Sequence, residues 1–422
     1  MATKSWRRIG VAGATIAALA IGALAPPAAH ADPVPEDPNL VLHYDFSTAG
    51  AVTDVSGHGN NGTIVGAGAT VVDGVLTLPG GAANSGAGYV RFPANLFDGK
   101  DTLTISTWLR NDTGAGNYAA MFFGSGTGTF PAQYWLLNPR NPSSRFKSVI
   151  TNGNTPSAPW GTEYGISPTT ASQGVAGPTT GTAWAMYTTV ITPTSITGYY
   201  NGALVGTVAT SRTVTQFGTG LVGYIGRSTY ADPFYKGSVD DVIVSTSAYN
   251  AGQIAELYHQ SDRTTTDQTN AALTADADAV SLPSEATADI TLPATGTPNL
   301  SRVTWESSQP SVIAADGKLT RPAEGQADAS VTLTGTFTLG GQSITRGYTV
   351  AVPALNPQRD LERTADAFDL GITVAASDIV LNTESQGATI AWASSAPAVV
   401  SATGARTRAP GAAPRPPAAA VA

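Results

Sequence analysis

Short runs in which apolar and polar residues alternate fill the chain from residue 40 to about residue 245. Most of the runs end at Gly, Asn, Asp or Pro, a pattern that predicts short antiparallel strands separated by turns. The runs that show it best are Leu40–Phe46, Thr63–Val65, Val75–Leu78, Tyr89–Phe92 and Leu103–Leu109. A long succession of such strands favours a β-sandwich.

One hairpin and one helix stand out from this pattern. The segment Ala185–Val208 predicts consecutive strands, and Asn201-Gly202 within it is typical of a type I′ turn because both residues tolerate positive φ angles. A helical period appears at Asn250–His259, where the apolar residues fall on one face. Many strands closed by one helix again indicate a sandwich.

Several stretches of this region resemble, in order and spacing, the laminin-G-like jelly rolls of the concanavalin A-like class. They are Leu42–Phe46 with Asp54–Gly62, then Thr104–Leu109, Tyr224–Arg227 and Lys236–Val244. The resemblance implies a single jelly-roll β-sandwich over residues 39–262.

An internal repeat follows the jelly roll. The stretch Val303–Val312 (VTWESSQPSV) recurs as Ile390–Val399 (IAWASSAPAV), 87 residues later. A period near 90 residues fits an immunoglobulin-like sandwich of about 100 residues. The Trp-x-Ser-Ser-x-Pro-x-Val pattern resembles atypical bacterial Ig-like modules found in secreted, actinobacterial-type glycan-degrading proteins. Trp305 and Trp392 hold the same place in both copies, which indicates core packing.

The second copy is incomplete, because a tail rich in Pro and Ala replaces its later strands and proline cannot donate to a strand ladder. We interpret the chain as a truncated or frame-shifted product of a longer gene; the alternative is a natural disordered wall spacer. The predicted fold is all-β: a concanavalin-like jelly roll, an Ig-like sandwich and a partial second Ig-like copy. The expected segments are a signal peptide (1–31), a linker (32–38), the jelly roll (39–262), a polar linker (263–269), an Ig-like domain (270–354) whose strands begin near Ala272, a partial copy (355–408) and a disordered tail (409–422).

The N-terminus predicts secretion. Basic residues in Lys4–Arg8 precede the apolar run Ile9–Ala25, and Ala29-His30-Ala31 is the small-x-small pattern that signal peptidase cleaves. The alternative, a membrane anchor, needs about 20 apolar residues, more than this run supplies. We expect an extracellular protein with no membrane attachment after cleavage.

The net charge and the absence of cysteine limit the partners and the chemistry that the chain can have. The formal net charge is −8, and cleavage after Ala31 removes three positive and no negative side chains, which makes it −11. Such a chain lacks the basic surface that nucleic acids or anionic membranes attract. It contains no cysteine, which excludes disulfides and thiolate chemistry. We expect a monomer.

No catalytic constellation is evident. The four histidines lie far apart without the spacing of a metal site. Asp240 and Asp241 are adjacent, and successive strand residues point to opposite faces, so they cannot flank one glycosidic bond unless a bulge intervenes. We therefore assign no catalytic residue and expect no enzyme activity from this chain.

A structural calcium ion is one interpretation of the oxygen-bearing side chains near the first and last strands. Calcium takes six to eight oxygen ligands, and the family resemblance implies an ion where these two strands meet. The candidate ligands are Asp45, Asp54, Asn60, Asn61 and Asp240. The alternative is that these side chains cap turns.

Sugar binding would use aromatic rings that stack on the sugar and polar groups that bond its hydroxyls. Trp108 and Trp184 lie in apolar strand-like runs and are assigned to the core. The candidate ligand-binding residues lie near loops: Tyr134, Trp135, Trp160, Tyr164, Arg227 and Tyr230, with Asn138 and Arg140 as further polar partners.

The function expected from these features is that of secreted, non-catalytic carbohydrate-binding or scaffolding modules from a multimodular polysaccharide-degrading protein. The expected partner is a polysaccharide, and arabinose-containing polysaccharides are among the candidates. The alternatives are the accessory region of an arabinofuranosidase-like glycoside hydrolase whose catalytic domain is missing here, and a cell-surface adhesion protein.

Overall fold

The computed structural model describes residues 37–125, 133–151, 159–167, 174–366, 378–381, 383–385, 388–405 and 407. The predicted signal peptide and tail lie outside these residues, as does most of the linker 32–38. The chain divides into two compact units, of which one contains residues 1–279 with 295–302 and 337–344, and the other the rest. None of the helices in the described ranges is long and apolar enough to cross a membrane.

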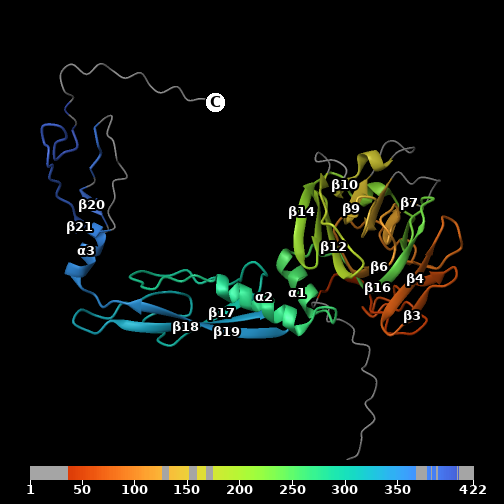
Figure 1. Cartoon of the computed structure of the whole chain (residues 1–422), viewed down its shortest axis with the longest axis horizontal. Helices are drawn as coiled ribbons and strands as arrows, with labels where there is room; N and C mark the ends of the chain where they lie inside the picture. Colours follow the sequence, from red (N-terminus) through yellow and green to blue (C-terminus); the bar gives the residue numbers. More distant parts are fainter. Residues whose placement is uncertain are drawn as a thin grey trace, which may run out of the picture. The chain divides into compact units, whose positions relative to one another are not determined.

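Two eight-stranded sheets form the jelly roll (Figure 1). In spatial order the first contains β14 (Ala203–Ala209), β13 (Ser195–Tyr200), β12 (Trp184–Thr192), β6 (Leu103–Asn111), β16 (Phe234–Ser245), β4 (Val75–Gly81) and β3 (Thr70–Val72), with β1 (Leu40–Tyr44) also paired to β16. The second contains β11 (Gly174–Val175), β10 (Tyr164–Ile166), β9 (Lys147–Thr151), β8 (Tyr134–Asn138), β7 (Met121–Ser125), β15 (Leu221–Ile225), β5 (Tyr89–Arg91) and β2 (Thr63–Val65). Two 3₁₀ turns, η1 (Pro159–Thr162) and η2 (Thr215–Phe217), lie in the loops. The prediction of an all-β fold is confirmed.

The main core contains apolar side chains from both sheets. Along β6, Ile105 and Leu109 belong to this core, whereas Trp108 belongs to a second cluster with Leu257 of helix α1 (Ala251–Gln260). Because alternate residues of a strand point to opposite faces, these two clusters bury both faces of β6. The predicted core position of Trp108 is correct.

The predicted hairpin and helix are both present. Asn201 and Gly202 join β13 to β14 with φ angles of 49° and 78°, the positive values that a type I′ turn needs. Helix α1 begins after Asn250, whose side chain accepts a hydrogen bond from the Gln253 amide while the Gln253 side chain accepts one from the Asn250 amide.

The expectation of a polar linker followed by a strand near Ala272 is wrong, because helix α2 (Thr266–Ala279) occupies this segment. A capping box starts it: the Thr265 hydroxyl accepts from the Gln268 amide, and the Gln268 side chain accepts from the Thr265 amide. The helix contains neither Gly nor Pro and buries Ala272, Leu273 and Ala277.

The first Ig-like copy contains a three-stranded sheet of β17 (Arg302–Ser307), β18 (Ala329–Leu339) and β19 (Gln342–Val352). Its core centres on Val331, Leu333 and Val350, and Trp305 packs against it while its indole N–H donates to the Pro293 carbonyl over 2.8 Å. Trp305 is thus partly buried and packs on this core, in agreement with the predicted core packing. Helix α3 (Pro357–Asp366) follows, and Arg321 donates to both carboxylate oxygens of Asp360 within it over 2.9 and 3.0 Å.

The described part of the second copy repeats local hydrogen bonds of the first. The Ile290 amide donates to the Gly317 carbonyl over 3.0 Å, and the Ile379 amide donates to the Gly404 carbonyl over 2.9 Å. Both glycines have a φ of 85°, and a Cβ on either would lie 1.9 Å from the facing carbonyl oxygen. Only two short strands, β20 (Glu384–Ser385) and β21 (Ala388–Thr389), occur in the described residues of this copy.

Asp276 in α2 is a fully buried carboxylate with four hydrogen-bond donors around it. One of its oxygens accepts from the backbone and side-chain nitrogens of Asn299, and the other accepts from the amide and hydroxyl of Ser301. Gly296 lies so close that a Cβ there would be 2.6 Å from the carboxylate. The helix therefore fixes the loop before β17 through one side chain.

We expect Asp276→Ala to release this loop. The substitution removes the acceptor for buried donors of Asn299 and Ser301, and each unpaired buried donor costs about 1–3 kcal/mol. Amide hydrogen exchange at residues 299 and 301 should accelerate strongly, while the exposed neighbour substitution Asp278→Ala should leave it unchanged. Unaltered protection in Asp276→Ala would show that other contacts hold the loop.

Candidate functional site

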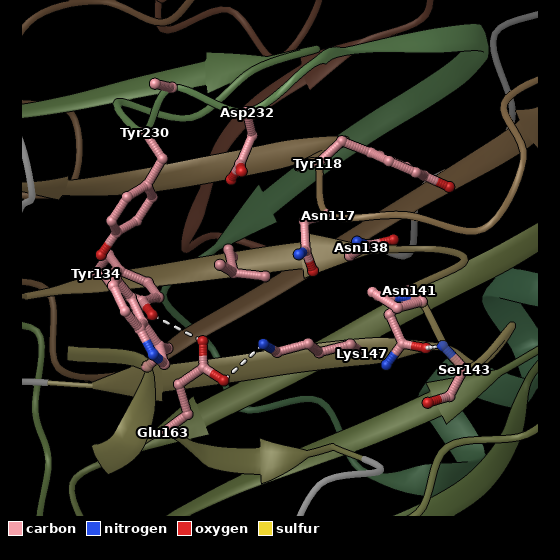
Figure 2. A pocket seen from close by; sticks show the side chains of 14 residues that line it. Asn117, Tyr118, Tyr134, Asn138, Asn141, Ser143, Lys147, Glu163, Tyr230 and Asp232 are labelled. Carbon is pink, nitrogen blue, oxygen red and sulfur yellow. Dashed lines mark hydrogen bonds and ion pairs between the residues drawn. The ribbon is translucent and has the colours of Figure 1, made fainter. Parts of the chain in front are cut away.

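A pocket of about 540 Å³ lies on the side of the second sheet opposite the main core. Its walls come from β8, β9, η1 and the loops before β7, after β8 and before β16. The lining residues are Asn117, Tyr118, Tyr134, Leu136, Asn138, Asn141, Pro142, Ser143, Lys147, Trp160, Glu163, Tyr230, Ala231 and Asp232 (Figure 2). The volume falls in the range of about 300–1,000 Å³ that is common for small-molecule sites.

Strand β8 builds the floor of the pocket by alternation. Tyr134, Leu136 and Asn138 line the pocket, whereas Trp135 and Leu137 belong to the main core. Successive strand residues point to opposite faces of the sheet, so adjacent aromatic residues receive different roles. Tyr134 therefore lines the pocket, and Trp135 packs in the core.

A buried charge network lies at one end of the floor. The Tyr134 hydroxyl donates to Glu163 Oε1 over 2.7 Å, and Lys147 Nζ lies 2.6 Å from Glu163 Oε2, as Figure 2 shows. Glu163 is only 5% exposed. A buried carboxylate is stable when it is paired and hydrogen-bonded, and both oxygens of Glu163 have such a partner. Burial and the nearby Glu163 charge raise the pKa of Tyr134 far above its ordinary range, so its hydroxyl remains a donor.

Three aromatic rings form one side of the pocket. The Tyr134 and Tyr230 rings meet edge to face with centroids 5.5 Å apart, and Tyr230 meets Trp160 in the same way at 6.3 Å. Tyr134 is buried, but Trp160 in η1 is 51% exposed. The series runs from the floor to the open surface and ends in a large apolar ring, which is a surface on which a ligand can stack.

Polar groups complete the rim. The Asn138 side chain donates to the Gly116 carbonyl and accepts from the Arg140 amide, and the Asn141 side chain accepts from the Ser143 and Arg145 amides. These two residues fix the loops around the pocket. Asp232 is different, because no hydrogen bond reaches its carboxylate from any residue in the described ranges. Burial raises the pKa of Asp232 above its ordinary value, and the Lys147 ammonium opposes this in part.

The structure brings three of the six predicted ligand-binding residues together: Tyr134, Trp160 and Tyr230. Trp135 does not line the pocket, contrary to its expected place on a binding face, because this side chain is 1% exposed and its indole N–H donates to the Ser148 hydroxyl over 3.0 Å. Tyr164 lies under the Arg212 guanidinium, 4.7 Å from its carbon, and does not line the pocket.

Arg227 also lies elsewhere, where its guanidinium packs against the rings of Tyr89, Tyr224 and Phe234. Of the two additional polar partners, Asn138 lines the pocket and Arg140 does not. Sequence reasoning missed the charged residues Lys147, Glu163 and Asp232. Their signal was weak, because the pairing of Lys147 with Glu163 depends on how β8, β9 and η1 are placed side by side.

Most of the candidate calcium ligands form hydrogen bonds with backbone groups. The two oxygens of Asp54 accept from the amides of His43, Ser56 and Asn60, and Asp45 accepts from the amide and hydroxyl of Ser47. The side chains of the other two candidates in this loop, Asn60 and Asn61, also form hydrogen bonds with backbone groups.

Asn61 accepts from the Asp54 amide, and Asn60 donates to the Val41 carbonyl. Burial alone raises the pKa of Asp54, but the hydrogen bonds from Ser56, His43 and Asn60 outweigh it and hold this pKa below its ordinary value. This geometry matches the turn-capping alternative.

Asp240 differs from these candidates because it pairs with a charged side chain. Arg263 Nε lies 2.6 Å from its Oδ2, and its Oδ1 accepts from the Asp241 amide. Within the described ranges no three His, Asp or Glu side chains come together in a way that could hold a metal ion. Asp45, Asp54 and Asp240 therefore do not converge as one ligand set, and calcium binding stays a prediction.

The pair Asp240-Asp241 sits at an irregular point of β16. A register shift between Asp240 and Val242 marks a bulge, and Asp241 has a φ of 34°. The bulge inserts an extra residue between the core residues Val239 and Val242, so strand alternation does not keep the two carboxylates on opposite faces here. Asp240 pairs with Arg263, and Asp241 lies 3.4 Å from His43 Nε2.

We expect Asp54→Ala to lower the melting temperature to the same extent in calcium and in chelator. The substitution leaves backbone amides of His43, Ser56 and Asn60 without their acceptor, a loss of about 1–3 kcal/mol for each group that stays buried. Thermal unfolding of the variant and the parent in both buffers checks this. Calcium that stabilises the parent but not the variant would instead favour an ion at this loop.

Two family models match the chain in the predicted order. Residues 84–255 match the concanavalin A-like lectin/glucanases superfamily, and residues 266–355 match the atrophied bacterial Ig domain. The resemblance of the first part to a concanavalin-like jelly roll and of the second to a bacterial Ig-like module is confirmed. The second match begins at the first residue of helix α2 and so includes this helix.

One similar protein is an α-L-arabinofuranosidase of Bifidobacterium longum subsp. longum, 28% identical over 262 residues. The match covers 60% of this chain and 22% of the relative, so this chain spans about a fifth of that relative's length.

Similar solved structures include domain 4 of AbnA, an extracellular GH43 arabinanase from Geobacillus stearothermophilus, in complex with arabinotriose. It is 18% identical with a TM-score of 0.40, over 52% of this chain and 98% of that one. A Trypanosoma rangeli sialidase is 18% identical with a TM-score of 0.38, over 55% of this chain and 35% of that one. No functional conclusion follows from likenesses at these TM-scores.

Proposed function

We propose that residues 39–262 are a non-catalytic carbohydrate-binding module of a secreted polysaccharide-degrading protein, and that the glycan binds in the pocket on β8. The observation that carries the proposal is the aromatic series Tyr134–Tyr230–Trp160 beside a polar rim. Carbohydrates present apolar C–H faces and a periphery of hydroxyls, and this pocket offers a partner for each.

The exposure of Trp160 supports a ligand. A large aromatic ring that is half exposed loses part of the stabilisation that burial would give it, and a ring that lines a cavity is available to a ligand there. The Trp160 ring meets Tyr230 edge to face, and about half of its surface stays open to solvent, where a sugar face can stack.

The class of glycan is proposed from the similar protein. Its name describes an enzyme that acts on α-L-arabinofuranosyl groups, and the part that matches this chain is a small share of its length. We therefore place arabinose-containing polysaccharides, arabinan and arabinogalactan, first among the candidate ligands. Affinity should be modest, because binding at a single site must also strip water from the sugar hydroxyls.

Two tryptophans provide a matched test. Trp160→Ala should weaken retention in an arabinan or arabinogalactan affinity gel at least about tenfold, as loss of a central aromatic contact does. Its stability should change by no more than about 0.5 kcal/mol, because the side chain is at the surface. Trp135→Ala should lower the free energy of unfolding by about 3–5 kcal/mol, because it opens a cavity in the core.

Leu204→Ala is the control, since Leu204 is 57% exposed on β14 of the other sheet. Its retention and stability should equal those of the parent. Undiminished retention after both Trp160→Ala and Tyr230→Ala would place the glycan outside this pocket. No retention of the parent on either polymer would count against arabinose-containing ligands.

A further inference from the structure

The charge of the pocket is set by three side chains. Lys147 contributes one ammonium, and Glu163 and Asp232 contribute two carboxylates. Lys147 and Glu163 form a close pair, with 2.6 Å between Nζ and Oε2, so each has its counter-charge. Asp232 is the charge that remains, and Figure 2 shows its carboxylate on the Tyr230 side of the pocket, across from the network around Glu163.

No other ionisable group of the described lining alters this balance. The lining contains no Arg or His, and the lining tyrosines have pKa values far above neutrality: burial raises the pKa of Tyr118 to about 12. The stretches 126–132, 152–158 and 168–173 contain no Asp, Glu, Lys, Arg or His in the sequence. With Asp232 ionised, the pocket therefore carries one net negative charge.

We propose that this pocket selects uncharged sugar residues over uronic acids, with the Asp232 carboxylate accepting hydrogen bonds from sugar hydroxyls. This inference rests on the proposed glycan-binding function and specifies the class of sugar.

A carboxylate can both bind the hydroxyls of a neutral sugar and repel the carboxylate of a uronic acid. An ionised carboxylate has two oxygens and can accept from two neighbouring hydroxyls, and such charge-assisted bonds are shorter and stronger than neutral ones. A uronic acid brings its own carboxylate, and the one ammonium in the pocket is already paired with Glu163. Like charges that meet without a counter-ion repel, most strongly where solvent is partly excluded.

The titration of Asp232 should also make sugar binding depend on pH. Its pKa lies above the ordinary value because burial disfavours the charged form, and Lys147, Glu163 and the hydroxyls of Tyr118, Tyr134 and Tyr230 are the titratable groups around it. Asp232 is ionised above this pKa. As the pH falls through it, the carboxylate gains a proton, so both its acceptor strength and its repulsion of uronates decline.

The test compares arabinogalactan with arabinogalactan whose primary hydroxyls have been oxidised to carboxylates, using the whole chain in affinity gels. The parent should retain the neutral polymer at least about tenfold more strongly than the oxidised one. Asp232→Asn keeps the size of the side chain and removes the charge, so it should weaken neutral binding and reduce the discrimination to about twofold or less. Asp73→Asn changes the net charge equally in the β3–β4 turn, where Asn tolerates the φ of 51°, and should behave as the parent.

The outcomes separate the two proposals. Retention of neither polymer by the parent overturns the proposed function and this inference with it. Retention of both polymers to the same extent, or discrimination that Asp232→Asn leaves intact, overturns the inference while the function stands. Neutral binding that weakens as the pH falls in the parent and stays constant in Asp232→Asn agrees with the assigned role; an identical pH profile in both contradicts it.

Discussion

The pocket depends on one buried carboxylate. Glu163 stands immediately before β10, and it is stable there because Tyr134 from β8 and Lys147 from β9 each satisfy one of its oxygens. These two bonds fix the end of η1 to the sheet. The position of η1 in turn places Trp160 at the edge of the pocket beside Tyr230. A paired charge inside the protein thus orients the exposed ring that we propose as the stacking surface.

The same bonds divide the side chains of the pocket into those that hold its shape and those that can meet a ligand. Tyr134, Lys147 and Glu163 are committed to one another, and Asn138 and Asn141 are committed to the loops. Trp160, with its exposed ring, and Asp232, with its carboxylate oxygens, are the groups that we assign to the sugar. Recognition by a rigid floor and a few groups at the rim limits the ordering cost that weakens binding.

Much of the fold followed from local sequence, and parts of the site did not. The Asn201-Gly202 turn and helix α1 were predictable because their signals lie within a few residues, and the Thr265–Gln268 capping box of α2 was available in the same way but was overlooked. Trp135 was expected on a binding face because it lies near a loop, but the two-residue period of β8 turns it away from the pocket and into the core. The Glu163 network joins residues 16 and 29 positions apart, and only the pairing of β8 with β9 reveals it.

Chemical-shift mapping with an isotope-labelled chain tests the central claim most directly. On titration with arabinogalactan oligosaccharides, the indole resonance of Trp160 and the amides of residues 230–232 should shift together, while the indoles of Trp108, Trp135 and Trp305 should not move. Shifts that cluster instead around Arg227, on the first sheet or in the Ig-like copy, with Trp160 unchanged, would contradict a glycan site in the pocket on β8.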